Sequence, residues 1–476
     1  MAEQASNTKV SSKVVFKSGL WYTISTFLFR SIAFITTPII VRVLSRTQYG
    51  DFNNMQSWVG LLVIFASCCL EQTIIRAKLD YEDEIDSYSY SILIAQTVLT
   101  TVVFLFIGIF LGPICAYTKI DPKYFMILYL YTVFLNAYGI FVTRERAHYR
   151  YKAYSLTTGL IVVAYCLLTV FLVLKMDDKL DAIIYGNYIP YIIVGIVFSA
   201  ILAKDGKHFS WEHVKYALPL GLPLLPHTLS IILLGSSDTI MITKMLSADY
   251  TALYSLSSKI PNIVSVLLNA MNGAWAPWFL DTLKLQDKES IRRVSNIYYK
   301  IFMILILGIM LLAPEVMLIL GGKKYLPGLS LVPPLIVGCI FQFAYTMYVQ
   351  VEFYEKKMST VSTATAIAAL TNIVLNFLFM SFFGYKVAAY TTLVSYMVLF
   401  GLHYRTACKL GYKTIFDRRV IFTGLGLSIA SIPVFLFLYQ MKLVRWIVVV
   451  IYGIFMIYYL YKRRDFIFRY FKKGNK

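Results

Sequence analysis

The chain has 476 residues, of which 58% are hydrophobic and 15% are charged, and its mean hydropathy is +0.67. Soluble domains are seldom more than about half apolar, so this composition excludes an ordinary soluble protein and leaves no room for a large soluble domain. The formal net charge of +20 does not indicate a nucleic-acid partner, because Lys and Arg are spread over short connections and form no basic module with interleaved aromatic residues.

Apolar segments follow one another along the whole chain, each close to the roughly 20 residues that cross a bilayer. They predict an all-α polytopic membrane protein with about fourteen transmembrane helices. The predicted spans are residues 18–44, 53–71, 88–111, 124–143, 153–174, 182–202, 216–243, 253–276, 297–320, 329–351, 360–382, 386–404, 419–438 and 444–461. Only the tripeptide Phe383-Gly384-Tyr385 separates the eleventh span from the twelfth.

The distribution of basic residues predicts the orientation. If the N-terminus is cytoplasmic, the inner connections carry more than twice as many Lys and Arg residues as the outer ones. This is the positive-inside pattern, and it predicts a multi-pass membrane protein with both termini cytoplasmic. The outer connections are all short, which disfavours a polysaccharide polymerase, because such enzymes hold catalytic groups on a long external loop.

Arg30 lies in the middle of the first span, between Phe29 and Ser31. An arginine at the centre of a membrane helix costs about 2.5–3.5 kcal/mol on insertion scales, so its side chain is expected to face a wet cavity or a partner rather than lipid. We interpret Arg30 as an anion-binding residue of a transport cavity. The alternative is a structural arginine that a neighbouring helix satisfies.

An acidic run, Asp80-Tyr81-Glu82-Asp83-Glu84-Ile85-Asp86, falls on the cytoplasmic connection between the second and third spans. Arg76 and Lys78 lie beside it. A solvated, charge-balanced loop is the favoured interpretation, and a metal site is the alternative.

The sequence around Leu44-Ser45 recurs weakly at Leu246-Ser247, with the spans matching one for one. Six spans per copy predict two six-helix bundles related by a pseudo-two-fold axis along the membrane normal, followed by two additional helices. The predicted segments are a cytoplasmic N-terminal segment 1–17, bundles 18–205 and 206–407, two helices in 408–461 and a basic cytoplasmic tail 462–476.

The second copy opens with three prolines, Pro219, Pro223 and Pro226. Proline removes a backbone donor and collides with the preceding turn, so the helix is expected to be bent or broken near its cytoplasmic end. The prolines are interpreted either as a static kink or as a hinge for opening and closing a cavity.

Two further charged residues lie at equal depth on the predicted hairpin around Ser247. Asp238 precedes the turn and Lys259 follows it, so a buried ion pair is favoured, and the alternative is an Asp238 that couples transport to a cation or substrate. Glu71 and Glu315 lie near span ends and are interpreted as interfacial. No catalytic, cofactor or metal-binding motif is recognised, which favours a transporter over an enzyme.

Two stretches resemble a known family. The segment 27–58, FLFRSIAFITTPIIVRVLSRTQYGDFNNMQSW, and the segment that begins GLPLLPHTLSIILLGSSDT at Gly221 are similar to units of the polysaccharide repeat-unit flippases, which are Wzx-like translocases of O-antigen and capsular polysaccharide. These belong to the multidrug/oligosaccharidyl-lipid/polysaccharide exporter superfamily. One departure is Thr251-Ala252-Leu253-Tyr254, where family members often keep a glycine before the aromatic residue.

The resemblance implies a flippase that moves an undecaprenyl-pyrophosphate-linked oligosaccharide by alternating access between two bundles. A pyrophosphate suits a guanidinium, which binds it with two donors. It implies Arg30 as the main cavity residue, with Arg144 and Arg146 receiving the head group, although both are also ordinary positive-inside residues. Membrane lipids and a glycan polymerase are the other implied partners. A flippase for lipid II or a spore-wall precursor and a cation-coupled multidrug exporter remain the alternatives.

Overall fold

The computed structural model describes residues 32, 34–148 and 150–473, so Arg30 and most of the first predicted span lie outside the described residues. The described part is almost entirely helical and contains no strand. Two compact units divide it at Ala252/Leu253. The all-α prediction is therefore confirmed.

The first unit begins with an apolar helix over Phe34–Val43 and continues with regular elements through the boundary at residue 252. Its helices are α2 (Arg46–Ser67), η1 (Leu70–Thr73), α3 (Ile74–Asp80), η2 (Glu82–Glu84), α4 (Ile85–Ile109), α5 (Leu111–Thr118), η3 (Pro122–Tyr124), α6 (Phe125–Ala147), α7 (Tyr151–Lys175), α8 (Lys179–Gly206), α9 (Trp211–Gly221), η4 (Leu222–Leu224), α10 (Leu225–Met245) and α11 (Ala248–Ser257), the last of which crosses the boundary.

The second unit contains the remaining helices. They are α12 (Lys259–Lys284), α13 (Lys288–Gly321), η5 (Lys323–Leu331), α14 (Val332–Tyr354), α15 (Met358–Phe383), α16 (Val387–Lys409), α17 (Arg418–Leu438) and α18 (Lys442–Lys473).

Eleven helices of the described part are long and apolar enough to span a membrane, or twelve if the bent pair α2 and η1–α3 is one span. The protein is therefore a multi-pass membrane protein, and the count of fourteen spans stays a prediction. The expected separation at Phe383-Gly384-Tyr385 is confirmed, since α15 ends at Phe383 and Gly384 takes the positive φ of 70° that glycine adopts readily. Helix α18 continues to Lys473, through most of the predicted basic tail, whose cytoplasmic location stays a prediction.

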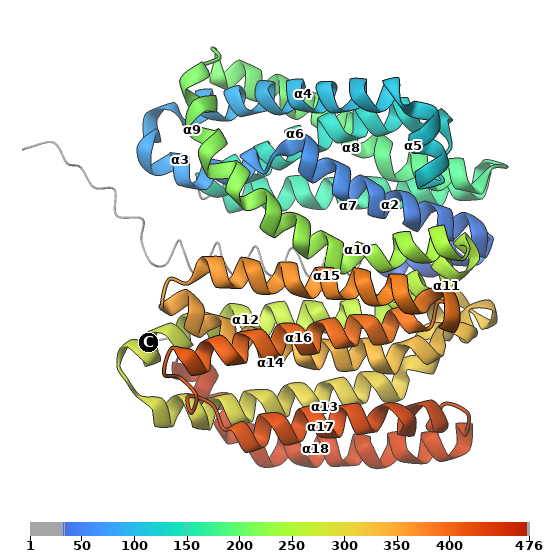
Figure 1. Ribbon diagram of the computed structural model, residues 1–476, viewed down its shortest axis with the longest axis vertical. Helices are drawn as coiled ribbons and strands as arrows, with labels where there is room; N and C mark the ends of the chain where they lie inside the picture. The colour runs from blue at the N-terminus through green and yellow to red at the C-terminus, as the bar shows by residue number, and fades with distance from the viewer. Residues whose placement is uncertain (1–31, 33, 149, 474–476) are drawn as a thin grey trace, which may run out of the picture. The chain divides into compact units, whose positions relative to one another are not determined.

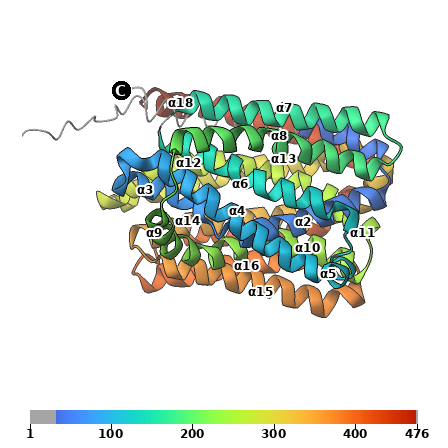
Figure 2. The ribbon, with the colours of Figure 1, turned by 90° about the horizontal axis from the view of Figure 1, so that it is seen from above.

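Close helix packing around α8 organises the first unit. Helix α8 packs against α6 and α7, and α4 packs on α6 and α8 (Figure 2). Gly186 and Gly195 of α8 make this packing possible, because a Cβ there would overlap Thr169 of α7 and the backbone of Phe134 of α6, respectively. Small residues that let helix backbones approach closely are the usual basis of packing in membranes.

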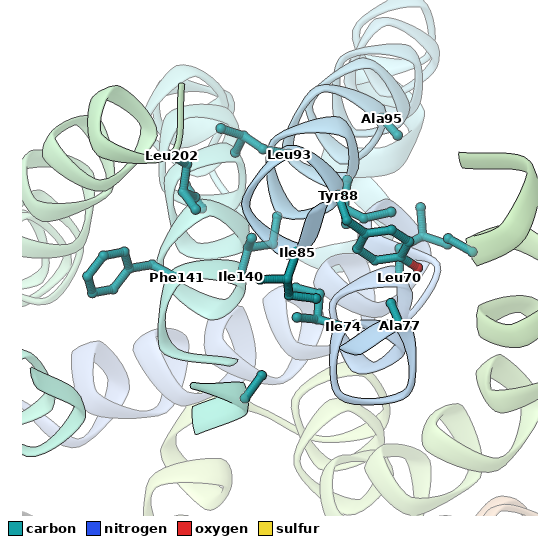
Figure 3. Close-up of a cluster of buried hydrophobic side chains, with 14 of the residues drawn as sticks. Leu70, Ile74, Ala77, Ile85, Tyr88, Leu93, Ala95, Ile140, Phe141 and Leu202 are labelled. Atoms are coloured by element: carbon teal, nitrogen blue, oxygen red, sulfur yellow. The ribbon is translucent and has the colours of Figure 1, made fainter. Parts of the chain in front are cut away.

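A buried apolar cluster joins the break after α2 to the rest of the first unit. Leu70, Ile74 and Ala77 of η1 and α3 lie beside Tyr88 of α4 (Figure 3). The Tyr88 hydroxyl also lies 2.7 Å from the Thr73 hydroxyl, which satisfies both polar groups in this apolar setting.

Helix α14 is the centre of the second unit, and most of its residues are buried. It packs against α12, α15, α16 and α17. Helices α13, α17 and α18 lie side by side at one edge of the unit (Figure 1). Helices α9 and α10 belong to the first compact unit, whereas the repeat placed them in the second bundle. The boundary between the two units reflects packing contacts, whereas the boundary between the two predicted bundles was taken from the sequence repeat. The two bundles and the axis that relates them therefore stay a prediction.

Candidate functional site

The three prolines lie at an interruption between α9 and α10. Pro219 is inside α9, Pro223 lies in the 3₁₀ turn η4, and Pro226 begins α10. A 3₁₀ turn thus interrupts the α-helical hydrogen bonding at the place that the sequence predicted. Proline explains the interruption, because it supplies no backbone N–H to a helix interior but fits the first turn of a helix. Whether this interruption acts as a hinge stays a prediction.

A second interruption, which the sequence pattern did not indicate, lies beside the first. Cys68 and Cys69 both adopt left-handed backbone conformations with φ of 47° and 56°. The axis bends by 57° between α2 and the η1–α3 segment. Helix α9 ends against this bend at Gly221, where a Cβ would lie 2.9 Å from the Cys68 carbonyl oxygen. The two helix breaks therefore contact each other within the first unit.

Gln96 of α4 satisfies polar groups that the α2 break releases. Its fully buried amide nitrogen donates to the Ser67 carbonyl oxygen at 2.9 Å and to the Glu71 carboxylate at 2.8 Å. A released carbonyl in a membrane protein is tolerated only where protein or water bonds it. Glu71, which we interpreted from the sequence as interfacial, is thus hydrogen-bonded to Gln96 at the break.

Arg144, at the end of α6, lies in a cluster of carboxylates and is only 2% exposed. Its Nη1 lies 2.9 Å from Asp205 and 3.3 Å from Asp86, and its Nη2 lies 3.0 Å from Glu145, which is itself buried. Phe141 lies under the guanidinium at 5.1 Å. Head-group binding by Arg144 stays a prediction, and it would require these ion pairs to open.

Arg144→Met is expected to lower the free energy of unfolding by about 3 kcal/mol, because Glu145 would keep a buried charge with only Arg150, 3.6 Å away, beside it. Arg146→Met is the matched control. Arg146 is exposed on the same helix turn and forms no ion pair with any described residue, so its replacement should change stability by no more than about 0.5 kcal/mol.

Thermal unfolding of the two purified variants measures the difference. An Arg144→Met protein as stable as the Arg146→Met protein would contradict the structural role of Arg144.

His148 follows Arg144 in the connection between α6 and α7. Burial lowers the pKa of His148 below its ordinary value, and the positive charge of Arg150 lowers it further, while Asp86 opposes this shift. The unfolded chain therefore binds a proton at a higher pH than the folded protein does. This contribution to stability is complete above the unfolded-state pKa near 6.5 and is lost as the pH falls through the lower folded-state pKa.

We expect His148→Gln to remove part of the stability loss that occurs between pH 7 and pH 5. The measurement is the melting temperature of both proteins across this range. Parallel curves for the two proteins would show that His148 does not contribute.

Asp238 is 1% exposed and lies in α10 of the first unit, whereas Lys259 is half-buried and begins α12 of the second. Their ion pair stays a prediction. Arg30 lies outside the described residues.

The second unit contains polar pairs that spacing along the sequence did not indicate. Glu315 accepts hydrogen bonds from the buried Arg445, one of them at 2.6 Å, so it is an ion-pair partner, and its interfacial position stays a prediction. Glu352 accepts from His403 Nδ1 at 2.7 Å, with both side chains almost fully buried. Each pair joins residues of two different helices, and a single sequence gives no local signal for such a contact.

A buried amide and hydroxyl network joins α15 to α16. Asn376 accepts from the Thr391 hydroxyl at 2.6 Å and donates to Asn372, which in turn donates to Thr392. These buried polar groups therefore satisfy one another inside the second unit. No group of three or more His, Cys, Asp or Glu side chains that suits a metal ion is found among the described residues.

Comparison with known proteins identifies relatives. A family model described as polysaccharide biosynthesis protein matches residues 15–283. A protein of the Lsg locus of Haemophilus influenzae is 24% identical over 380 residues, covering 75% of this chain and 89% of the relative. An uncharacterised membrane protein of Methanocaldococcus jannaschii is 22% identical over 414 residues, covering 80% and 81%.

Similar solved structures are transporters. Lipid II flippase MurJ in an inward closed conformation matches with a TM-score of 0.70 at 15% identity, covering 94% of this chain and 99% of that one. An inward-facing multidrug resistance transporter of the MATE family in the MOP superfamily matches with a TM-score of 0.57 at 13% identity, covering 81% and 95%. The chain therefore has the fold of these transporters.

Proposed function

The chain belongs to the polysaccharide biosynthesis protein family, and from this we propose that it is a flippase for an undecaprenyl-pyrophosphate-linked oligosaccharide repeat unit. It would move this unit from the cytoplasmic to the outer leaflet of the bacterial cytoplasmic membrane, with both termini cytoplasmic. The glycan would serve O-antigen, capsule or exopolysaccharide synthesis, and a glycan polymerase would use the product.

The observation that carries the proposal is the conjunction of this family with the transporter fold. A family model that matches more than half of the chain connects it to polysaccharide synthesis. The likeness to MurJ, over 94% of the chain, gives it the architecture of a protein that translocates rather than synthesises. A lipid-linked glycan is the cargo class that satisfies both observations.

Arg30 is proposed to bind the pyrophosphate of the carrier in the transport cavity. The cargo carries at least two negative charges, and a guanidinium offers two parallel donors that match phosphate oxygens. Arg146 is proposed to receive the head group at the cytoplasmic side, where its exposed side chain remains open to a ligand. Arg144 would contribute only in a conformation that releases its carboxylate partners.

Alternating access requires helices that can change their angle between two conformations of the protein. The two adjoining helix breaks of the first unit suit such a change of angle. The 57° bend at Cys68–Cys69 contacts the end of α9 next to the 3₁₀ turn that contains Pro223. Backbone bends of this kind change angle without unpacking whole helices. We propose that Pro219, Pro223 and Pro226 let α10 move relative to α9 during transport.

Asp238 and Lys259 are proposed to form an ion pair in one state of the transport cycle. Each single neutralisation, Asp238→Asn or Lys259→Met, should then reduce membrane abundance and thermal stability. The loss should be larger for Lys259→Met, at about 3–5 kcal/mol, because it leaves the buried Asp238 carboxylate without its partner, whereas Lys259 is only half-buried. The double variant should recover much of this loss. Unchanged stability with failed export would instead favour a role of Asp238 in coupling.

A lipid II flippase is the second candidate, and the MurJ likeness favours it. Both candidates share a polyprenyl pyrophosphate and differ in the glycan. Deleting the gene distinguishes them. A repeat-unit flippase predicts that lipid-linked repeat units accumulate inside, that surface polysaccharide disappears and that the cells survive. Intact surface polysaccharide with a failing cell wall would contradict the repeat-unit proposal.

A further inference from the structure

One end of the second unit gathers the starts of α13 and α17 and the end of α16. Arg292 of α13 donates from Nη2 to the Thr414 carbonyl oxygen at 2.6 Å, and Tyr299 donates to the Ile421 carbonyl oxygen at 3.3 Å. These bonds hold the first turns of α13 against the connection from α16 to α17. The basic residues at these three helix ends are therefore held close together.

Two adjoining open hollows lie at this end, with volumes of about 680 Å³ and 590 Å³, and Arg418 lines both. We refer to them together as the basic hollow. Its cationic lining residues, all exposed, are Arg292, Arg405, Lys409, Lys413, Arg418 and Arg419.

The positive charge of the basic hollow is not balanced by the described residues. Asp417 is the carboxylate that lines it, and Asp417 Oδ1 accepts the backbone N–H groups of Arg419 and Val420 as the cap of α17. None of the six cations forms an ion pair with a described carboxylate. Like charges that line one hollow repel one another, and a bound anion relieves this repulsion.

The cations of the basic hollow lie at or beside the ends of three candidate membrane spans, Lys288–Gly321, Val387–Lys409 and Arg418–Leu438. The ends of membrane-spanning helices lie near the headgroup region of a bilayer. Phe422, one turn further into α17, lines the hollow and is 43% exposed. On the same face of α17, exposed apolar side chains continue at Ile429 and Phe437. The cationic hollow is therefore followed along α17 by an exposed apolar face. A phospholipid has the matching arrangement, because its charged phosphate is followed by apolar acyl chains.

We propose that the basic hollow binds the headgroup of an anionic glycerophospholipid. The Arg418 guanidinium, shared by both hollows and 6.0 Å from the Tyr404 ring, donates to the phosphate. The surrounding Lys and Arg side chains add attraction, and the acyl chains lie along α17 beside Phe422. Clusters of basic residues at the ends of membrane helices bind such headgroups by this combination of charge and placement.

The test compares two double variants of the full-length protein in detergent. Arg405→Gln with Lys409→Gln removes two charges of the basic hollow, and neither side chain forms a hydrogen bond or ion pair with a described residue. Lys356→Gln with Lys357→Gln is the control, because it removes two exposed charges from the α14–α15 connection outside the hollow. Native mass spectrometry with phosphatidylglycerol and with phosphatidylcholine measures binding, and the melting temperature confirms folding.

The proposal predicts that the wild-type and control proteins bind phosphatidylglycerol at least about tenfold more tightly than the Arg405/Lys409 variant. Binding of phosphatidylcholine should be weak in all three. Equal phosphatidylglycerol binding by the two variants would overturn the proposal. Binding of polyglutamate in place of phosphatidylglycerol would also overturn it and indicate an acidic protein partner. Because the glycan cargo is absent from this assay, neither result depends on the flippase function.

Discussion

Replacing Arg30 with alanine is expected to abolish glycan export while leaving a folded protein in the membrane. The physical reason is that removing a guanidinium from a wet cavity relieves a desolvation cost, whereas the pyrophosphate loses its two-donor partner. Surface polysaccharide in a strain without the native gene measures export, and immunodetection in membrane fractions measures abundance. The expected loss of export is nearly complete.

Substitutions that keep or reverse the charge refine this test. Arg30→Lys should rescue export only in part, because an ammonium keeps the charge but loses the planar fork. Arg30→Glu should be the most damaging, since it places negative charge against the cargo. Normal export by Arg30→Ala would show that Arg30 is structural, and so would a loss of export that merely follows loss of the protein.

Gly195→Ala is expected to destabilise the first unit by about 2–3 kcal/mol. A Cβ at Gly195 would overlap the Phe134 backbone carbonyl oxygen, so α6 and α8 would have to move apart. Gly139→Ala on α6 is the control, because a Cβ there meets no atom within 4 Å. Alanine's higher helix propensity should leave the Gly139 variant unchanged or slightly more stable.

Thermal unfolding of the two alanine variants in the same detergent measures the difference. A Gly195→Ala protein as stable as the Gly139→Ala protein would mean that α6 and α8 do not approach as closely as described.

The class of fold was predictable from the sequence because it depends on composition and apolar length. Each span is a local property of about 20 residues, and Gly384 marks the turn between α15 and α16. The proline interruption was predictable for the same reason, since proline acts on its own backbone turn. The family resemblance, carried by the segments that begin at Phe27 and Gly221, agrees with the family match over residues 15–283.

The bend at Cys68–Cys69 was not predictable, because neither residue favours a positive φ. It depends on contacts from distant segments: Gln96 bonds the released Ser67 carbonyl oxygen, and Gly221 fits against Cys68. The ion pair of Glu315 was not predictable for a related reason. Its partner Arg445 follows 130 residues later, on a helix whose packing against α13 no local pattern indicates.

Arg144 illustrates the limit of reading charge from position alone. Its place at the end of a span was compatible both with a residue that binds the cargo head group and with an ordinary positive-inside residue. Its three carboxylate partners include Asp86 and Asp205, which come from the start of α4 and the end of α8. The contacts favour a structural role, and only tertiary packing brings them together.

Translocation by the purified protein tests the central claim most directly. The protein is reconstituted into liposomes that contain an undecaprenyl-pyrophosphate-linked oligosaccharide, and a membrane-impermeant glycosidase measures how much glycan becomes accessible. We predict transbilayer movement well above that of protein-free liposomes and of liposomes containing Arg30→Ala. Equal glycan accessibility in all three preparations, with correctly folded protein present, would contradict the flippase account.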